Sequence, residues 1–321
     1  MKKLSQKVVF VSTLKGSLWG GSEELWNLTA IEFLKNGFHV SILIYDFGYL
    51  NDKLFYLKNL GAKIYTRPRK SNLIVRILNK MKLFNEFLNP YKVLLKINPD
   101  IVIVTDGATY YTANDDQFYF ILTKYFKKNY SIICQGNHQY HIPNNRELAM
   151  NLFNNAKNVF FVSDNNREEC FHQLASRLDN TYVIQNPLNI SQNEFIPYPS
   201  IDNKIHIAIV GRLNIEDKGQ DLVIKMLCSE YWRSSNCQFH LYGKGHDENY
   251  LSKLINYYKV TDLIKLEGEK DIKSIWSKCH ILLLPSLIEG TSLAMLEALF
   301  LGRICVVSKV GGSNEWIKDG I

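Results

Sequence analysis

One stretch of this 321-residue chain, from Pro285 to Gly312, constrains the fold more than any other. The apolar run Ile281 to Leu284 just before it predicts a buried strand. Residues 293–301 are apolar on almost every face, which is typical of a buried helix that ends at Gly302. A further apolar run, Ile304 to Val307, predicts the next strand. The stretch is therefore a β-α-β crossover whose first loop lies at the carboxyl end of a strand, where open α/β sheets bind ligands.

Two carboxylates stand out in this apolar unit, Glu289 in the loop and Glu297 in the helix. An ionised Glu297 inside the helix needs partners, because an unpaired buried carboxylate would take up a proton instead. A pair of ligand hydroxyls would satisfy it. A helix that opens with Gly290, Thr291 and Ser292 presents backbone N–H groups that can bind a phosphate. The alternative is that Glu289 is a solvated loop charge and Glu297 lies on an exposed edge of the helix, and this segment alone leaves both open.

The order of these residues resembles a known family. The Glu-x7-Glu spacing lies inside P-S-x-x-E-G and is followed by E-A-x-x-x-G-x-x-V-V-x-x-x-V-G-G. This pattern resembles family 4 of the retaining glycosyltransferases, which have the glycosyltransferase B fold. The resemblance implies that Glu297 holds the ribose hydroxyls of a nucleotide and that Glu289 lies against the donor sugar, beside Gly290–Leu293. The family often has Gly-Phe-Gly or Gly-Phe-Pro after the first Glu, and this chain has Gly-Thr-Ser, so the pattern does not identify the donor sugar.

A second group of candidate residues follows another predicted strand, Ile205 to Val210. Arg212 comes directly after this strand, and Lys218 stands at the start of the next helix. Two cations at the carboxyl end of a strand are poor core residues and good phosphate ligands, although ordinary loop charges are the alternative. The segment from Gly211 resembles the family's G-R-L-x-x-x-K-G, which implies that both cations bind the donor diphosphate. The resemblance also implies that Glu269, at the end of a later strand, lies near the nucleotide base.

The amino-terminal part of the chain shows the same alternation of elements. Residues Val8 to Ser12 and Val40 to Tyr45 predict strands, and Gly20 and Gly21 predict a tight turn at the start of the helix between them. A glycine pair lets a ligand approach the backbone at a helix N-terminus. The turn resembles the family's Gly-Gly-x-Glu loop, which implies that these glycines contact the donor.

One histidine and one acidic pair are further candidates. His138 comes just past the predicted strand Ser131 to Cys134, where the resemblance implies a histidine near the donor sugar. A structural role is the alternative, and His141 is a second candidate for that place. Asp115 and Asp116 could indicate a metal site, but metal binding requires converging ligands, and we interpret the pair as charge at a helix start. We therefore expect no metal site.

Length and composition favour two globular α/β domains. The chain is 46% apolar, 12% aromatic and 21% charged. Three prolines without periodicity between Gln185 and Lys204 indicate a linker. We predict an amino-terminal Rossmann-like domain at residues 1–190 that binds the acceptor, a linker at 191–204, and a carboxyl-terminal Rossmann-like domain at 205–321 that binds the nucleotide-sugar. The resemblance implies that the domains face each other across a cleft, and that the second domain lacks its last elements, because family members continue further.

Positive charge is concentrated in one segment of the chain. Eleven Lys or Arg residues and one acid lie between Lys53 and Lys96, a charge of +10, so that the rest carries −3 of the net +7. Residues 69–88 predict a basic amphipathic helix, which can lie on an anionic membrane surface or pack on its own sheet with a solvated basic face. Both interpretations stay open. We expect no nucleic-acid partner, because the aromatic residues here fall in apolar positions rather than on a stacking surface.

The location of the protein is predicted from its cysteines and its apolar runs. The six cysteines have no metal-type spacing, so free thiols in a reducing cytoplasm are expected. The apolar runs are of strand length, and the basic start has no cleavage site of a signal peptide. We expect a cytoplasmic protein, peripheral on the inner face of the plasma membrane if the basic helix binds lipid.

The function that the resemblance implies is that of a retaining, metal-independent hexosyltransferase. It would transfer a sugar from a UDP-sugar or GDP-sugar to a hydroxyl of a saccharide or lipid-linked acceptor, in the synthesis of a cell-envelope polysaccharide, lipopolysaccharide or glycolipid, with no cofactor. The candidate catalytic residues are Glu289, Arg212, Lys218 and His138. One alternative is a nucleotide-sugar epimerase of the same fold, which needs acid and base carboxylates. Another is an inactive or regulatory component of a membrane-associated glycan assembly.

Overall fold

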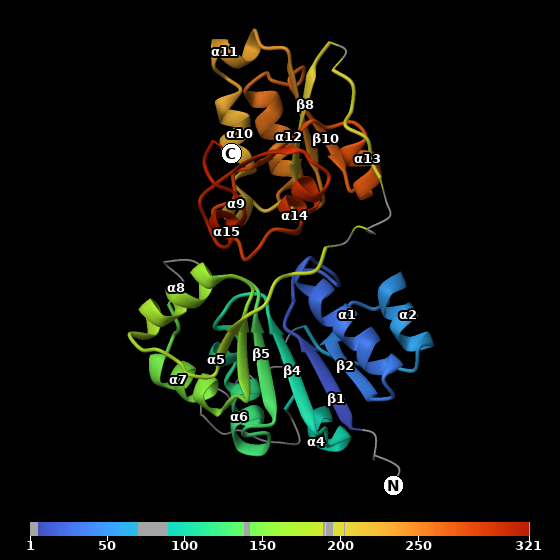
Figure 1. The fold of residues 1–321 in the computed structure, drawn as a ribbon, viewed down its shortest axis with the longest axis vertical. Helices are drawn as coiled ribbons and strands as arrows, with labels where there is room; N and C mark the ends of the chain where they lie inside the picture. Colours follow the sequence, from blue (N-terminus) through green and yellow to red (C-terminus); the bar gives the residue numbers. More distant parts are fainter. Residues whose placement is uncertain are drawn as a thin grey trace. The chain divides into compact units, whose positions relative to one another are not determined.

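Two compact units make up the part of the chain that the structure describes. The structure is a computed structural model and describes residues 6–69, 89–137, 142–188, 190, 195–201 and 203–320. The units are Met1–Asn186 and Pro187–Ile321. Each contains one parallel β-sheet with helices on its faces (Figure 1). The predicted α/β class with two Rossmann-like sheets is confirmed.

The sheet of the first unit has seven parallel strands in the order β3-β2-β1-β4-β5-β6-β7. The strands are β1 (Lys7–Ser12), β2 (His39–Tyr45), β3 (Lys63–Arg67), β4 (Ile101–Asp106), β5 (Tyr130–Cys134), β6 (Asn158–Phe161) and β7 (Thr181–Val183). The order reverses between β1 and β4, which pair directly, with Val8 opposite Ile101. The first two strands begin one residue before the starts predicted from sequence.

Helices cover both faces of this first sheet. Trp26 and Leu57, from α1 and α2, pack on one face, and Leu94 and Phe118 belong to a larger core on the other. The helices are α1 (Ser22–Lys35), α2 (Asp52–Asn59), α4 (Val93–Ile97), α5 (Tyr111–Asn114), α6 (Asp116–Tyr125), α7 (Arg146–Asn155) and α8 (Asp164–Leu174). Asp115 caps α6 by accepting hydrogen bonds from the N–H groups of the next turn, in agreement with its interpretation as helix-start charge.

The second unit has five parallel strands in the order β10-β9-β8-β11-β12. The strands are β8 (Ile205–Val210), β9 (Cys237–Tyr242), β10 (Ile264–Gly268), β11 (Ile281–Leu284) and β12 (Ile304–Val307). The helices are α9 (Ile215–Lys218), α10 (Gln220–Met226), α11 (Glu230–Arg233), α12 (Glu248–Tyr257), α13 (Ile272–Trp276), α14 (Leu293–Phe300) and α15 (Ser313–Trp316). Separate apolar cores lie on its two faces, one containing Leu251 and the other Trp276. The predicted strand-loop-helix-strand unit, from β11 to β12, is confirmed.

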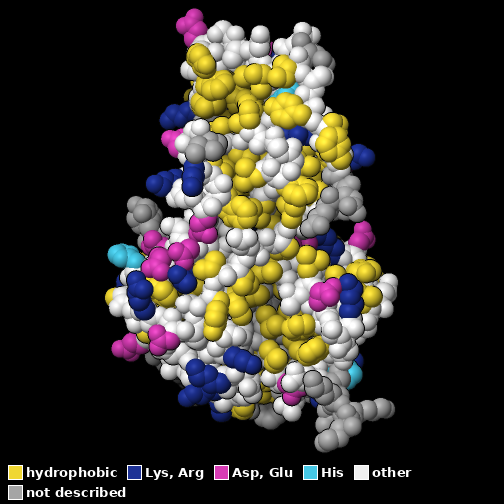
Figure 2. Space-filling view, in the orientation of Figure 1, with side chains coloured by type: hydrophobic (Ala, Val, Ile, Leu, Met, Phe, Trp, Pro, Cys, Tyr) yellow, Lys and Arg dark blue, Asp and Glu magenta, His cyan; other side chains and the backbone are white. Residues whose placement is uncertain are grey.

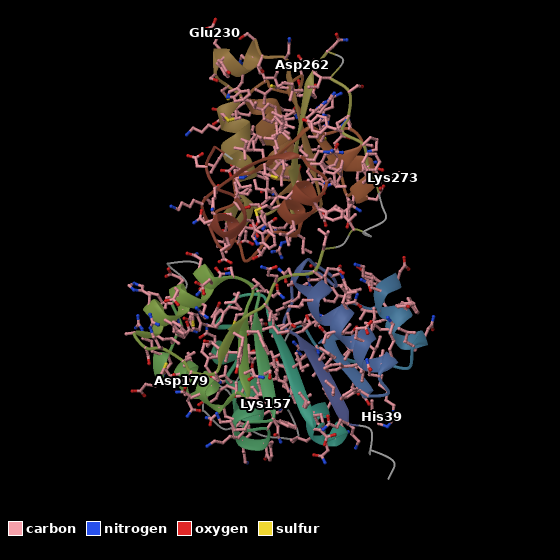
Figure 3. The ribbon with its side chains drawn as sticks, viewed as in Figure 1. His39, Lys157, Asp179, Glu230, Asp262 and Lys273 are labelled. Atoms are coloured by element: carbon pink, nitrogen blue, oxygen red, sulfur yellow. The ribbon has the colours of Figure 1, made fainter. Side chains whose placement is uncertain are left out.

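The direction of the strands decides where ligands can bind in each unit. His39 begins β2 and Lys157 precedes β6, and both lie at the amino ends of the strands of the first sheet (Figure 3). Asp262 lies at the amino end of β10 in the second. At the opposite end of the second sheet, one loop follows β8 and another follows β11. The strand order reverses between these two adjacent strands, and open α/β sheets bind their ligands at such a point.

The segment that leads into β8 packs on the second unit. Ile196 is 4% exposed and belongs to the apolar core that contains Trp276. The guanidinium of Arg303, itself 4% exposed, donates hydrogen bonds to the carbonyls of Ile196 (3.2 Å), Pro197 (2.7 Å) and Trp276 (2.8 Å). The described part of the expected linker is therefore held by the second unit, and the two units divide after Asn186.

The membrane prediction falls largely outside the described residues. Of the expected basic helix, residues 69–88, the structure describes only Arg69, whose guanidinium lies 4.5 Å from the ring of Phe47. On the face drawn in Figure 2, basic and acidic side chains are interspersed over both units. Among the described residues, every helix is too short or too polar to cross a bilayer.

Candidate functional site

Two loops meet where the strand order of the second sheet reverses. The loop after β8 ends in the short helix α9, and the loop after β11 leads to α14. The backbone N–H groups of Leu287 and Ile288 both donate to the carbonyl of Asp217, at 2.8 and 3.0 Å. These bonds fix the two loops against each other, although Asp217 and Leu287 are 70 positions apart in the sequence.

Glycines allow the loops to approach this closely. Gly219 has φ +60°, and a Cβ there would lie 2.4 Å from the carbonyl oxygen of Pro285. Gly311 has φ +54°, and a Cβ there would lie 2.4 Å from the carbonyl oxygens of Glu289 and Gly290. Any other residue would be strained in this backbone conformation and would clash with backbone atoms. The site is therefore built on a tightly packed backbone.

Each cation of the site has a carboxylate partner. Lys218 Nζ lies 2.5 Å from Glu289 Oε1, which also accepts a hydrogen bond from the hydroxyl of Ser286 at 3.0 Å. Arg212 Nη2 lies 3.3 Å from Asp217 Oδ2. The Lys218 side chain is 20% exposed and that of Arg212 is 46% exposed. The structure thus brings three predicted residues, Arg212, Lys218 and Glu289, to one end of one sheet.

The start of α14 is the third component of the site. Gly290 and Thr291 are buried, Ser292 is the N-cap residue and Leu293 is the first residue of the helix. Glu297 lies in the second turn and is 8% exposed, so the structure favours the buried position over the exposed edge. The helix begins at the same end of the sheet as the two cations, and its positive N-terminal end adds to their field.

The remaining predicted residues of the second unit lie at the ends of neighbouring strands. Gly211 follows β8, and its N–H donates to the carbonyl of Tyr242 at 3.0 Å. A Cβ at Gly211 would lie 3.8 Å from the side chain of Lys218. Glu269 follows β10, is 73% exposed and lies 3.8 Å from Lys244 Nζ. Both are near the carboxyl end of the sheet, as expected.

Of the predicted site residues, two belong to the first unit and one lies outside the residues that the structure describes. Gly20 and Gly21 lie in the loop between β1 and α1. Gly21 is the N-cap residue of α1 and has no side chain that could cap the helix. The hydroxyl of the next residue, Ser22, donates a hydrogen bond to Glu23 Oε1 at 3.1 Å. His138 lies outside the described residues. The structure therefore leaves the roles of these three residues as predictions.

Sequence reasoning missed a buried polar cluster at the carboxyl end of the first sheet. Asp106 ends β4 and is fully buried, and its carboxylate accepts hydrogen bonds from the N–H (3.0 Å) and hydroxyl (2.6 Å) of Thr112. Glu23 is 1% exposed and accepts from the indole of Trp26 at 2.8 Å. Burial raises the pKa of each carboxyl to about 7. The sequence signal that could have revealed this cluster is an acidic residue at the end of an apolar strand, which is the position of Asp106.

Arg67 also belongs to this cluster, although its charge was counted in the basic segment. It is 2% exposed and donates to the carbonyls of Ser12 (2.6 Å) and Leu43 (3.2 Å). Its guanidinium lies 3.9 Å from the ring centre of Tyr45 and 4.9 Å from that of Tyr91. This cation therefore contributes to the core of the first unit and not to a basic surface.

The arrangement in the second unit can stabilise a diphosphate. Two cations that follow β8 and the helix N-terminus that follows β11 lie at the same end of the sheet, where they can neutralise phosphate oxygens. Among the described residues, no three His, Cys, Asp or Glu side chains converge in a way that could hold a metal ion.

Comparisons with known proteins agree with this geometry. Residues 204–321 match the model of the family described as Glycosyl transferases group 1. The solved structure of the lipopolysaccharide outer core galactosyltransferase WaaB aligns over 98% of this chain and 84% of its own, with a TM-score of 0.65 and 19% identity. The glycosyltransferase B fold of this chain is thereby confirmed.

Two curated relatives match parts of the chain. One component of the human phosphatidylinositol N-acetylglucosaminyltransferase is 28% identical over 184 residues, which are 55% of this chain and 37% of the relative. The GtfA component of a UDP-N-acetylglucosamine–peptide N-acetylglucosaminyltransferase from Streptococcus pneumoniae is 25% identical over 179 residues, or 52% and 34%. The matched part thus spans about a third of the length of these relatives.

Proposed function

We propose, from the group 1 glycosyltransferase domain that residues 204–321 form, that this chain transfers a sugar from a nucleoside diphosphate sugar to an acceptor hydroxyl. The observation that carries the proposal is the meeting of Arg212 and Lys218 with Glu289 at the reversal of the second sheet, next to the N-terminus of α14. This site offers positive charge for a diphosphate and a carboxylate for a sugar beside it.

The proposed mechanism follows from the charge that develops during the reaction. As the bond from the anomeric carbon to the phosphate breaks, negative charge grows on the diphosphate and positive charge grows on the sugar ring. Arg212, Lys218 and the backbone N–H groups at the start of α14 stabilise the diphosphate. Glu289 lies against the sugar. Because these groups already supply positive charge, we propose that the transfer needs no divalent metal.

We further propose that the configuration at the anomeric carbon is retained. The acceptor hydroxyl attacks from the side that the diphosphate leaves, and the leaving phosphate takes the proton of this hydroxyl. Glu297 binds the ribose hydroxyls of the donor and Glu269 lies near its base, and the roles that the sequence predicts for Gly20, Gly21 and His138 stay predictions. Exclusion of water from the site prevents hydrolysis of the donor.

The names of the relatives suggest the substrates to test first. UDP-N-acetylglucosamine is the donor named for the pneumococcal relative, and we propose a UDP-sugar ahead of a GDP-sugar for this chain. The human relative is named for phosphatidylinositol and the structural neighbour for lipopolysaccharide. We propose a saccharide or lipid-linked acceptor, used at the cytoplasmic face of the membrane, to which residues 69–88 would bind.

A thermal-shift panel tests the donor site. Ligand that binds only the folded state raises the unfolding midpoint. We expect one member of a panel of UDP-, GDP- and ADP-sugars to raise it equally with and without EDTA, and Arg212→Ala and Glu297→Ala to reduce the rise markedly. Product analysis without acceptor would reveal an epimerase. A folded sample that responds to no donor would overturn the proposal and favour a non-catalytic role in a larger assembly.

A further inference from the structure

Both cations of the donor site are paired with carboxylates of the chain itself. Arg212 faces Asp217 at 3.3 Å, and Lys218 faces Glu289 at 2.5 Å. These four side chains carry no net charge together. A diphosphate that bound beside them would add negative charge next to two carboxylates that already lie within hydrogen-bonding distance of the cations.

The position of Asp217 is fixed by its neighbours. Its carbonyl accepts the N–H groups of Leu287 and Ile288, and its carboxylate oxygen Oδ2 accepts a hydrogen bond from Asn214 Nδ2 at 2.8 Å. The side chain of Asp217 is 28% exposed, so it lies at the surface of the loop that a ligand would approach. The carboxylate is thus held in place beside Arg212, where a phosphate oxygen would otherwise interact with the guanidinium.

We propose that Asp217 is an internal counter-ion that a donor diphosphate displaces from Arg212. A carboxylate and a phosphate both bind a guanidinium through charged hydrogen bonds, so the two compete for the same N–H groups. The same exchange at Lys218 releases Glu289 from its ion pair and makes it available to the sugar. This inference rests on the proposed function, because it assigns the ligand that replaces the carboxylates.

The exchange favours ligands with two phosphates. A diphosphate can replace both carboxylates, whereas a nucleoside without phosphates replaces neither. Asp217 therefore acts as a positioning residue that keeps Arg212 in the site before the donor arrives and lowers the affinity for a ligand that must displace it. Its removal is expected to strengthen diphosphate binding and to leave nucleoside binding unchanged.

Calorimetric titration of two matched variants tests this exchange. Asp217→Asn removes the charge and keeps an oxygen that can accept the hydrogen bond of Asn214. Glu216→Gln removes the same charge from the adjacent residue, which is exposed and has no ion pair among the described contacts. The probes are UDP, GDP and ADP, each compared with its nucleoside, at low and high salt.

We expect Asp217→Asn to tighten binding of the preferred nucleoside diphosphate about 3- to 10-fold, which corresponds to the loss of one partly exposed competing charge. Glu216→Gln should change it less than about twofold. Neither variant should change nucleoside binding or the unfolding midpoint appreciably. The gain for Asp217→Asn should shrink at high salt, because salt screens exposed charges.

Three results would overturn the inference. Weaker or unchanged diphosphate binding by Asp217→Asn would mean that Asp217 orients Arg212 and does not compete with the ligand. An equal gain in both variants would mean that the net charge of the loop, and not a specific exchange, sets the affinity. If the wild-type chain and both variants were folded and bound no nucleoside diphosphate, the proposed function would fail and this inference with it.

Discussion

The carboxyl ends of the two sheets use charged side chains in different ways. In the first unit, Asp106 and Glu23 are buried and hydrogen-bonded, and burial raises the pKa of each to about 7. In the second unit, Arg212 and Lys218 have partly exposed side chains that are paired with carboxylates. The carboxylate partners of the second group are partly exposed, whereas the partners of the first group are part of the core.

Changes in the buried group should affect folding, and changes in the partly exposed group should affect binding. A buried polar group that loses its partner costs free energy of folding, because water cannot replace the lost hydrogen bond. A partly exposed ion pair contributes little to stability, but its cation can contribute strongly to the binding of an anion. Mutations at equivalent places in the two units should therefore have separable effects.

The largest effect is expected for a backbone contact in the second unit. Gly243 has φ +136°, and a Cβ there would lie 2.0 Å from the carbonyl oxygen of Gly211. Gly243→Ala should reduce the free energy of unfolding by about 4 kcal/mol or more and abolish diphosphate binding. Urea denaturation measures the free energy of unfolding, and calorimetry measures diphosphate binding. This prediction tests whether the site of the second unit requires the close packing of its backbone in addition to its charged side chains.

Gly302 provides the control for this substitution. It has φ +68° at the end of α14, and no atom lies within 4 Å of a Cβ there. Gly302→Ala should cost only about 1 kcal/mol through backbone strain. An equal cost at both positions would mean that the close approach of Gly211 is not what requires glycine.

The next effect concerns the buried carboxyl that ends β4. Asp106→Ala leaves the N–H and hydroxyl of Thr112 without their acceptor and should cost about 2–3 kcal/mol of folding free energy. Binding of a nucleoside diphosphate to the second unit should not change. The control is Asp100→Ala at the start of the same strand, where an exposed carboxylate accepts the N–H of Lys7 at 2.7 Å, and its cost should stay below about 1 kcal/mol.

A loss of diphosphate binding in Asp106→Ala, measured in a sample that is still folded, would contradict this prediction. It would mean that the polar cluster of the first unit acts on the ligand and not only on the fold.

These two sites also show how far the sequence could be interpreted. The β11–α14–β12 unit was predictable because its apolar runs have the lengths of a strand and a helix and its turn residues stand at the boundaries. The proposed roles of Glu289, Arg212 and Lys218 rest on the resemblance of their motifs, and their place at the carboxyl ends of strands was predictable from the apolar runs. Their pairing was not, because the partner Asp217 looks like any loop acid in the sequence.

The first unit was harder to predict for a physical reason. Glu23 lies in the first turn of a helix, where acids are usually solvated, and only the packing of that helix in the folded unit buries it. Arg67 lies among ten other basic residues of its segment, and nothing local distinguishes the one that packs between two tyrosine rings. Burial of a single charged side chain depends on residues far away in sequence, which periodicity does not reveal.

A smaller effect is expected for one cation of the second unit. Arg212→Ala should weaken diphosphate binding about 10- to 30-fold, or about 1.4–2 kcal/mol, and should change the free energy of unfolding by less than about 0.5 kcal/mol. Lys273→Ala, which removes an exposed cation on α13 (Figure 3), is the control and should change neither quantity. If Arg212→Ala lowered stability as much as Asp106→Ala, the charged residues of the second unit would support folding as those of the first unit do.

The smallest net effect is expected for pH, because the two units respond with opposite signs. The pKa values of Glu23 and Asp106 are raised to about 7 in the folded chain. Their stabilising contribution is therefore complete below the ordinary pKa of a carboxyl and is lost as pH rises through about 7. His240, which is 1% exposed, has its pKa lowered to about 4 by burial, although Glu267 Oε1 lies 2.7 Å from its Nδ1. Its contribution is complete above about pH 6.5 and is lost as pH falls through 4.

Between about pH 4.5 and 6.5, the first unit should therefore lose stability as pH rises while the second unit gains it. Fluorine NMR of the chain labelled with 5-fluorotryptophan can follow the unfolding of each unit separately, because Trp26 is buried in the first unit and Trp276 in the second. Urea midpoints from the two resonances should move apart in opposite directions across this range. Asp106→Asn should flatten the response at Trp26 and leave that at Trp276 unchanged. Midpoints that moved together would mean that the two units unfold as one body, or that the buried carboxyls and His240 do not control their pH dependence.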